Sequence, residues 1–167
     1  MKKKLYEEES LKKIVDPKNL DNLVEKLKKD KKSIVSLNGS FDLLHAGHLQ
    51  IIYEASLQAD VLIVLLNSDL SIKKYKSKNR PIIDLKYRLQ MISALGFVGY
   101  VSWFDDVDPI KVLEKIMPNV HVNGKEYGDN CIESKIVKKN GGKIHLVDKV
   151  GDLSTTKILE KIKLCGF

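Results

Sequence analysis

Strand-like and helix-like segments alternate from Ser33 to the C-terminus, and this alternation limits the fold more than any other feature. The run Val61–Leu66 is apolar at every position, which is typical of a strand buried on both faces of a parallel sheet. Other short runs with strand character are separated from it by stretches with helical spacing. The predicted strands are 33–37, 61–66, 100–104, 120–122 and 143–147.

The predicted helices rest on apolar spacing and on residues that commonly begin a helix. Asp84 is a candidate N-cap, Asp108-Pro109 offers an N-cap followed by a first-turn proline, and Ser154 precedes the last helix. The predicted helices cover 19–29, 47–58, 85–95, 109–117 and 132–139, with a final one after Ser154.

This alternation predicts an α/β fold, a Rossmann-like parallel five-stranded sheet with helices on both faces and right-handed crossovers. In such sheets a ligand lies beyond the carboxyl ends of the strands, where the strand order reverses. The sequence contains no internal repeat and no linker rich in Gly, Ser or Pro. We therefore expect residues 1–167 to form a single domain, with 1–16 as a loosely held N-terminal arm.

The composition is that of a globular chain, with 43% hydrophobic and 31% charged residues among 167. No apolar run approaches the roughly 18 residues that a membrane helix needs. Glu7, Glu8 and Glu9 stand where a secretory signal would place its apolar stretch. These features predict a cytoplasmic protein without a membrane partner. Cys131 and Cys165 are read as ordinary thiols, and we predict no metal site.

The net charge of +7 favours an anionic partner, either a nucleic acid or a phosphorylated small molecule. A solvated lysine-rich surface also explains most of this charge. A nucleic-acid-binding module would need aromatic side chains among its basic patches, and the 7% of aromatic residues are scattered. We therefore predict no nucleic-acid partner.

A pair of histidines follows the first predicted strand. His45 and His48 flank Gly47 where a helix is expected to begin, and backbone N–H groups at a helix start favour an anion. Both imidazoles could then donate hydrogen bonds to phosphate oxygens. The alternatives are two solvent-facing or capping histidines, or a zinc site, for which no third ligand is evident nearby.

Hydroxyl and basic residues extend this pattern elsewhere in the chain. Ser154-Thr155-Thr156 opens the last predicted helix, either as a simple N-cap or as a second phosphate site. The run 73–81 is basic and is expected to form a loop at the ligand edge, where it could neutralise phosphates. A solvated charged surface is the alternative.

The segment Gly39-x-Phe41-Asp42-x-x-His45-x-Gly47-His48 resembles the signature of the cytidylyltransferase-like nucleotidyltransferases, and the resemblance continues from about residue 33 to 162. The resemblance implies catalytic roles for His45, His48, Lys76 and Arg88, and nucleotide contacts from Ser40, Phe41, His45, His48, Lys76, Ser154, Thr155 and Thr156. For Arg88 the alternative to a catalytic role is an exposed helical arginine.

The resemblance also implies a reaction in which an acceptor phosphate attacks the α-phosphate of a nucleoside triphosphate and pyrophosphate leaves. Such a reaction depends mainly on positioning and charge neutralisation. We expect Mg²⁺ to bridge the substrate phosphates. Family members are commonly dimers, so a homodimer is expected.

Intervening segments such as Asn79-Arg80-Pro81 and Trp103-Phe104-Asp105-Asp106 resemble adenylyltransferases that make ADP-heptose for lipopolysaccharide. These enzymes use ATP and D-glycero-β-D-manno-heptose 1-phosphate. The alternative is an enzyme like glycerol-3-phosphate cytidylyltransferase, which uses CTP. Candidate substrate contacts are Asp42, Asn67, Asp69, Lys74, Gly124 and Tyr127. For Asn67, Asp69 and Tyr127 the alternative is a turn or capping residue.

The chain departs from the adenylyltransferase pattern at two points. Cysteine is frequent where Ser40 stands, and Val-Lys-Gly is common where this chain has Val122-Asn123-Gly124. Lys125 is a possible substitute for the missing lysine.

Overall fold

The computed structural model describes residues 6–148, 151 and 153–166. In this part of the chain the strands form one parallel five-stranded sheet with the order β3-β2-β1-β4-β5. The predicted α/β class is therefore confirmed. The strands are β1 (Ile34–Gly39), β2 (Val61–Asn67), β3 (Tyr100–Phe104), β4 (Val120–Gly124) and β5 (Lys143–Val147).

The strand order reverses beside β1. The chain adds β2 and β3 on one side of β1, then returns and places β4 and β5 on the other side. Because the connections leave in opposite directions, a crevice is expected at the carboxyl ends of β1 and β4. This is the edge at which both histidines were expected.

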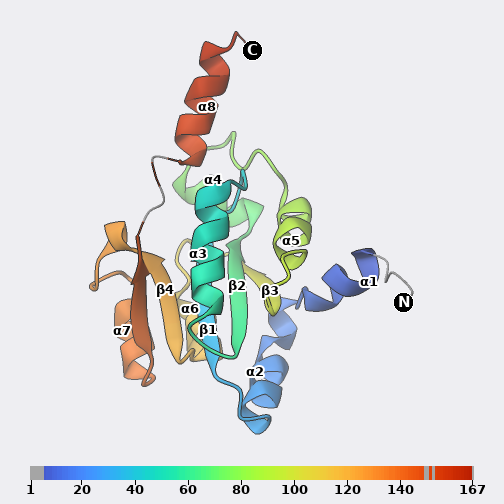
Figure 1. The fold of residues 1–167 in the computed structure, drawn as a ribbon, viewed down its shortest axis with the longest axis vertical. Helices are drawn as coiled ribbons and strands as arrows, with labels where there is room; N and C mark the ends of the chain where they lie inside the picture. Colours follow the sequence, from blue (N-terminus) through green and yellow to red (C-terminus); the bar gives the residue numbers. More distant parts are fainter. Residues whose placement is uncertain (1–5, 149–150, 152, 167) are drawn as a thin grey trace.

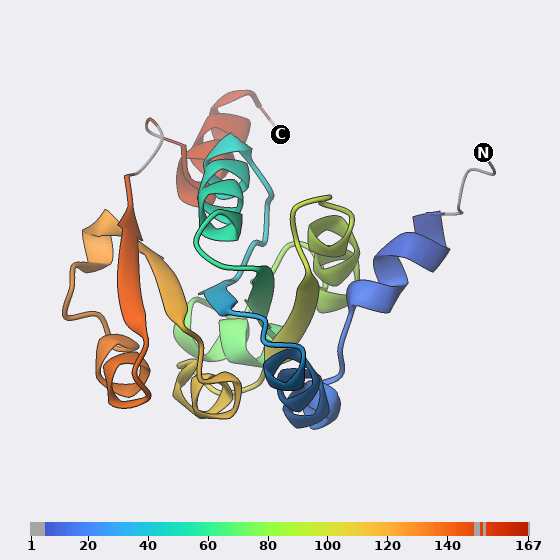
Figure 2. The ribbon, with the colours of Figure 1, turned by 60° about the horizontal axis from the view of Figure 1, so that its bottom comes forward.

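Helices cover both faces of the sheet (Figures 1 and 2). Helices α3 and α5 pack on one face, while α2, α6 and α7 pack on the other. Helix α8 stands apart from them at one end of the molecule (Figure 1). The helices are α1 (Tyr6–Ser10), α2 (Leu20–Lys29), α3 (Ala46–Ser56), α4 (Asp69–Tyr75), α5 (Leu85–Ser93), α6 (Ile110–Ile116), α7 (Ser134–Lys139) and α8 (Thr155–Leu164).

Burial on both faces explains the unbroken apolar run in β2. Leu62, Val64 and Leu66 belong to the core cluster on the α3 side. Ile63 and Leu65 belong to the cluster on the α6 side. Because side chains alternate across a strand, every position between 62 and 66 must be apolar.

The N-terminal segment is not loose along its whole predicted length. Ile14 forms a parallel bridge with Val101 of β3, and Lys13 Nζ donates to the Leu95 carbonyl at 3.0 Å. The Ser102 hydroxyl donates to the Val15 carbonyl at 2.7 Å. The expectation of a loosely held arm is therefore wrong for residues 13–15, while residues 1–5 lie outside the described residues.

Helix α4 was not predicted, because the basic run was read as a loop. The Ser68 hydroxyl caps α4 by accepting from the Ser71 N–H, so Lys73 and Lys74 are helical. Asp84 precedes α5 but makes no side-chain cap hydrogen bond. The Asp69 carboxylate accepts from the Leu85 N–H instead, which links the start of α4 to the start of α5.

Gly142 tests the packing of the strand that α7 leads into. A Cβ at this position would lie 2.3 Å from the Pro118 carbonyl oxygen and 2.9 Å from Val137 Cγ1. Gly142→Ala is expected to lower the free energy of unfolding by about 1–3 kcal/mol because backbone must move. Urea unfolding measures this loss. Gly96→Ala, where an added Cβ meets nothing within 4 Å, is the control, and an equal effect of both substitutions would contradict the packing.

Candidate active site

The two histidines meet at the start of α3. His45 is the N-cap residue, and its carbonyl oxygen accepts from the His48 N–H at 2.9 Å. The imidazole rings stack with centroids 3.7 Å apart. A Cβ on Gly47 would lie 3.2 Å from His45 Nδ1, so glycine leaves room for this arrangement. The motif thus gathers both imidazoles at the positive end of a helix.

The surroundings of His48 keep its imidazole neutral at pH 7. Burial, followed by the nearby His45 and Lys76, lowers the pKa of His48 from 6.5 to about 4, against an opposing effect of the Leu43 carbonyl. The Phe41 ring packs edge-on against His48 with centroids 5.2 Å apart. A neutral imidazole still has one N–H to donate, so His48 can serve as a hydrogen-bond donor without being charged.

A first cavity, of about 330 Å³, brings together segments from both ends of the sequence. Ser154 caps α8 by accepting from the Lys157 N–H at 3.2 Å, so the predicted cap is confirmed. Ser154 and Thr155 line the cavity together with His45 and Gly47, so the start of α8 faces the same cavity as the start of α3. The predicted site residues that line this cavity are Ser40, Phe41, His45, His48, Lys76, Gly124, Ser154, Thr155 and Thr156.

Lys76 lines the same cavity as these two helix starts. Its Nζ donates to the Ser40 hydroxyl at 2.9 Å. Burial first, then the charge of Arg80, lowers the pKa of Lys76, while Asp42 acts in the opposite direction. Among residues 6–148, 151 and 153–166, Lys76 forms no ion pair within 4 Å. A half-buried ammonium beside other cations is well placed for an anionic ligand.

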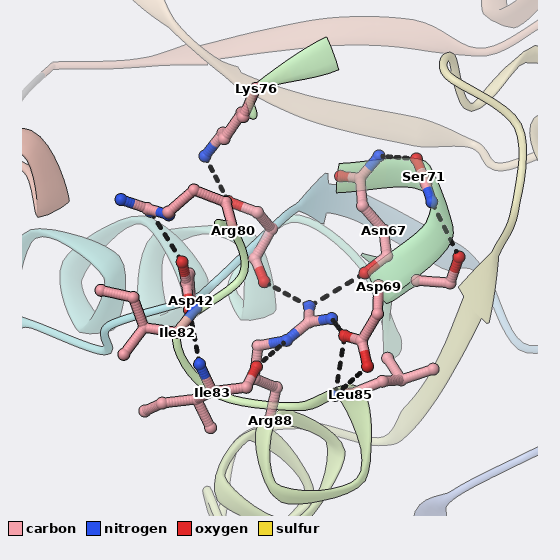
Figure 3. Close-up of polar contacts among 12 residues, drawn as sticks. Asp42, Asn67, Asp69, Ser71, Lys76, Arg80, Ile82, Ile83, Leu85 and Arg88 are labelled. Atoms are coloured by element: carbon pink, nitrogen blue, oxygen red, sulfur yellow. Dashed lines mark hydrogen bonds and ion pairs between the residues drawn. The ribbon is translucent and has the colours of Figure 1, made fainter. Parts of the chain in front are cut away.

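Arg88 does not face the cavity, and the catalytic contact predicted for it is wrong. Its side chain is fully buried, and Nη1 donates to the carbonyls of Ser40 at 2.6 Å and Asn67 at 2.9 Å. Nη2 donates to Asp69 at 2.7 Å, and Nε donates to the Ile83 carbonyl at 2.9 Å (Figure 3). Arg88 therefore links Ser40, which follows β1, to Asn67, which ends β2.

Asp42 is also structural rather than a substrate contact. This fully buried carboxylate accepts from the N–H groups of Ile82 and Ile83 and forms an ion pair with Arg80 at 2.7 Å (Figure 3). It thereby fixes the segment that follows Lys76. Because a buried charge needs several partners, this structural role accounts for the place of Asp42 in the motif.

The other predicted substrate residues divide between the cavities and the surface. Asn67 lines a second cavity, described below, whereas Asp69 and Lys74 line neither. Lys74 Nζ donates to the Asp105 carbonyl at 3.2 Å on the surface. Lys125 is paired with Asp148 at 2.6 Å and lines neither cavity, so it does not replace the missing lysine.

The second cavity, of about 360 Å³, adjoins the first at the end of β1. Sequence reasoning missed most of its lining, since the strand order that brings β1 beside β4 cannot be read from local patterns. Asn38 and Asn123 are the penultimate residues of these two neighbouring strands and line both cavities. Other polar lining residues that were not predicted to contact a substrate are Tyr75, Asp108 and Glu133.

Arg88 yields a stability test. Replacing the guanidinium by Met leaves the carbonyls of Ser40 and Asn67 and the Asp69 carboxylate without a donor, so Arg88→Met should lower the free energy of unfolding by about 3 kcal/mol. Urea unfolding measures the loss, with Lys86→Met on the exposed side of α5 as the matched control. Similar unfolding of both variants would show that the buried network does not hold the sheet edge.

His48 yields a test of pH dependence. Its folded-state pKa of about 4 lies below the unfolded value of 6.5, so the unfolded state binds the proton first as pH falls. The resulting loss of stability begins near pH 6.5 and is complete below about pH 4. His48→Asn should therefore lose less unfolding free energy than the wild type between pH 7 and pH 5. Parallel pH profiles in urea titrations would contradict this.

Comparisons with known proteins identify the family to which the chain belongs. Residues 36–162 match the family model described as cytidylyltransferase-like. The bifunctional protein HldE of Campylobacter concisus is 43% identical over 148 residues, which are 87% of this chain and 30% of that protein. HldE of Geobacter metallireducens is 40% identical over 149 residues, with the same coverage. The chain thus spans about 30% of the length of these relatives.

Solved structures of two other proteins have a similar fold. A lipopolysaccharide core biosynthesis protein from Thermoplasma volcanium superposes with a TM-score of 0.58 at 25% identity, covering 71% of this chain and 97% of that one. Pantoate-beta-alanine ligase from Francisella tularensis gives 0.61 at 18% identity, covering 92% and 78%, and shows the fold alone. With its motif, sheet and helix starts arranged in this way, the chain belongs to the cytidylyltransferase-like family of nucleotidyltransferases.

Proposed function

We propose that this chain transfers AMP from ATP to D-glycero-β-D-manno-heptose 1-phosphate, giving ADP-heptose and pyrophosphate for lipopolysaccharide synthesis. The observation that carries the proposal is the first cavity, which His45, His48, Lys76 and the Ser154-Thr155-Thr156 segment line together. The relatives named bifunctional protein HldE support the choice of a sugar phosphate. So does the Thermoplasma protein, whose name refers to the lipopolysaccharide core.

The reaction needs one bond to form and one to break. An oxygen of the acceptor phosphate attacks the α-phosphorus of ATP, and the bond from that phosphorus to the bridging oxygen of the β-phosphate breaks. Pyrophosphate carries away the electron pair. The acceptor phosphate is ionised at neutral pH, so no general base is required. The chain's contribution is alignment and stabilisation of charge on the phosphoryl oxygens.

Each end of the cavity has a distinct part in this proposal. His45 and His48 donate hydrogen bonds to the α-phosphate as negative charge builds on it. The N–H groups and hydroxyls at the start of α8 hold the β- and γ-phosphates. Lys76 lies between them and neutralises the acceptor phosphate as it approaches. Ser40 and Phe41 shape the nucleotide side of the cavity.

Mg²⁺ is proposed to enter bound to the phosphates of ATP. Within the described residues no group of three or more His, Cys, Asp or Glu side chains could hold a metal ion. Mg²⁺ commonly keeps several waters and takes few ligands from protein. Asp148 lines the first cavity and is exposed. It would be a water-mediated partner of the ion, in competition with its ion pair to Lys125.

The substrate assignment is tested by supplying both nucleotides with both acceptors. ATP with heptose 1-phosphate should give the highest kcat/KM, measured by pyrophosphate release. CTP with glycerol 3-phosphate, the pair used by glycerol-3-phosphate cytidylyltransferase, should give at least about 100-fold less, since a site built around one substrate's hydroxyls rejects others strongly. A preference for CTP would overturn the assignment.

The role of the histidines is tested by substitution. His48→Ala should lower kcat about 100- to 1000-fold, because one preorganised donor to the α-phosphate is lost, while urea unfolding at pH 7 stays cooperative. His145→Ala on β5 is the matched control, since His145 lines neither cavity. A His48→Ala enzyme with nearly wild-type kcat would refute the assigned role.

Assembly and location are also proposals. We infer a homodimer in the cytoplasm, without nucleic-acid or membrane partners, as for other enzymes that use soluble nucleotides and sugar phosphates. No helix in the described ranges is long and apolar enough to cross a membrane.

A further inference from the structure

The second cavity is the candidate binding site for the acceptor, and this inference rests on the proposed function. It meets the first cavity at Lys76 and at the carboxyl ends of β1 and β4. A molecule in the second cavity can therefore present a phosphate near Lys76, toward a nucleotide in the first. The residues that line both cavities are Asn38, Gly39, Ser40, Lys76, Asn123 and Tyr127.

Glu133 is an unusual residue in the lining of this cavity. Its side chain occupies the N-cap position of α7 but makes no cap hydrogen bond. Instead, Glu133 Oε2 accepts from Asn123 Nδ2 at 3.1 Å, and the residue is only 5% exposed. In the described part of the chain it has no ion-pair partner. A buried carboxylate with a neutral partner is costly to the fold, which points to a role in binding.

Charge is divided within the second cavity. Lys76 lies at the edge shared with the first cavity, while Glu133 and Asp108 line the remainder. Asp108 is partly engaged, since its Oδ1 accepts from the Ile110 N–H at 3.0 Å. This division suits a molecule with a phosphate at one end and an uncharged body at the other.

The neutral groups of the lining match hydroxyls. The amide of Asn67 and the phenols of Tyr75 and Tyr127 line the cavity with Asn123, and such groups both donate and accept. Burial, then Glu126 and Glu133, raises the pKa of Tyr127, so its hydroxyl stays a donor at neutral pH. An ammonium group would donate to Glu133 but, having no lone pair, could accept from none of the hydroxyl and amide donors in the lining.

We propose that Glu133 determines acceptor specificity by accepting hydrogen bonds from hydroxyl groups of the sugar, while its charge excludes acceptors with a carboxylate on the sugar ring. Asn123 holds the Glu133 carboxylate in position. The acceptor class is thus a neutral polyhydroxylated sugar 1-phosphate.

Glu133→Gln tests this inference in the full chain. The substitution keeps the shape but removes the charge, so KM for heptose 1-phosphate should rise about tenfold, the loss of one charge-assisted hydrogen bond. KM for ATP should stay within about twofold of the wild type, because the nucleotide occupies the first cavity. Relative kcat/KM for a hexuronic acid 1-phosphate against the matching hexose 1-phosphate should rise about tenfold as the repulsion is removed.

Two further variants make the result decisive. Glu114→Gln, the same change on the exposed side of α6, should alter none of these values. Glu133→Asp keeps the charge but shortens its reach, so it should weaken heptose 1-phosphate while still rejecting the hexuronic acid.

The outcomes separate the two proposals. If the wild type makes ADP-heptose but Glu133→Gln leaves both acceptor measurements unchanged, or raises KM for ATP alone, the specificity role is wrong and the proposed function stands. A higher kcat/KM of the wild type for an amino-sugar 1-phosphate than for the neutral sugar 1-phosphate would also show that the specificity role is wrong. If the wild type transfers AMP to no sugar phosphate, the proposed function fails and this inference fails with it.

Discussion

The buried guanidinium of Arg88 holds together the edge on which the site is built. It binds the carbonyls that follow β1 and end β2, and it pairs with Asp69 at the start of α4. Ser40, whose carbonyl Arg88 fixes, also receives the hydrogen bond from Lys76. The position of Lys76 thus depends on a charge that lines neither cavity. A buried arginine with so many protein partners is costly to desolvate, which is reasonable where several loops must keep one geometry.

Reversal of the strand order beside β1 places two cavities at one edge. Helix α3 leaves on one side and supplies the histidines, while Asn123 at the end of β4 faces Glu133 at the start of α7. The first cavity is rich in groups that favour anions, and the second combines amides, phenols and carboxylates. In the proposed function, a nucleotide in the first cavity and a hydroxylated acceptor in the second cavity meet at Lys76, which lines both.

The sequence predicted the parts of this site that depend on local order. His45, Gly47 and His48 lie at a helix start, and Ser154 caps the last helix. These positions could be predicted because strand patterns and capping residues mark them in the sequence. Arg88 and Asp42 could not be assigned in this way. Whether a charged side chain faces a ligand or the protein interior depends on burial, which follows from tertiary packing. Helix α4 was missed since a lysine-rich segment is consistent with either a loop or a short helix capped by Ser68. Glu133 belongs to no recognised sequence motif, and its hydrogen bond to Asn123 depends on how the segment between β4 and α7 folds back.

The central claim is that the starts of α3 and α8, over a hundred residues apart in the sequence, bind the same triphosphate. The most direct measurement is a crystal structure of the chain with Mg²⁺ and an ATP analogue that has a methylene group between the α- and β-phosphorus. The account predicts an α-phosphate oxygen within hydrogen-bond distance of a His45 or His48 nitrogen, and β- or γ-phosphate oxygens at Ser154, Thr155 or Thr156. A triphosphate bound to one helix start alone, or outside the first cavity, would contradict it.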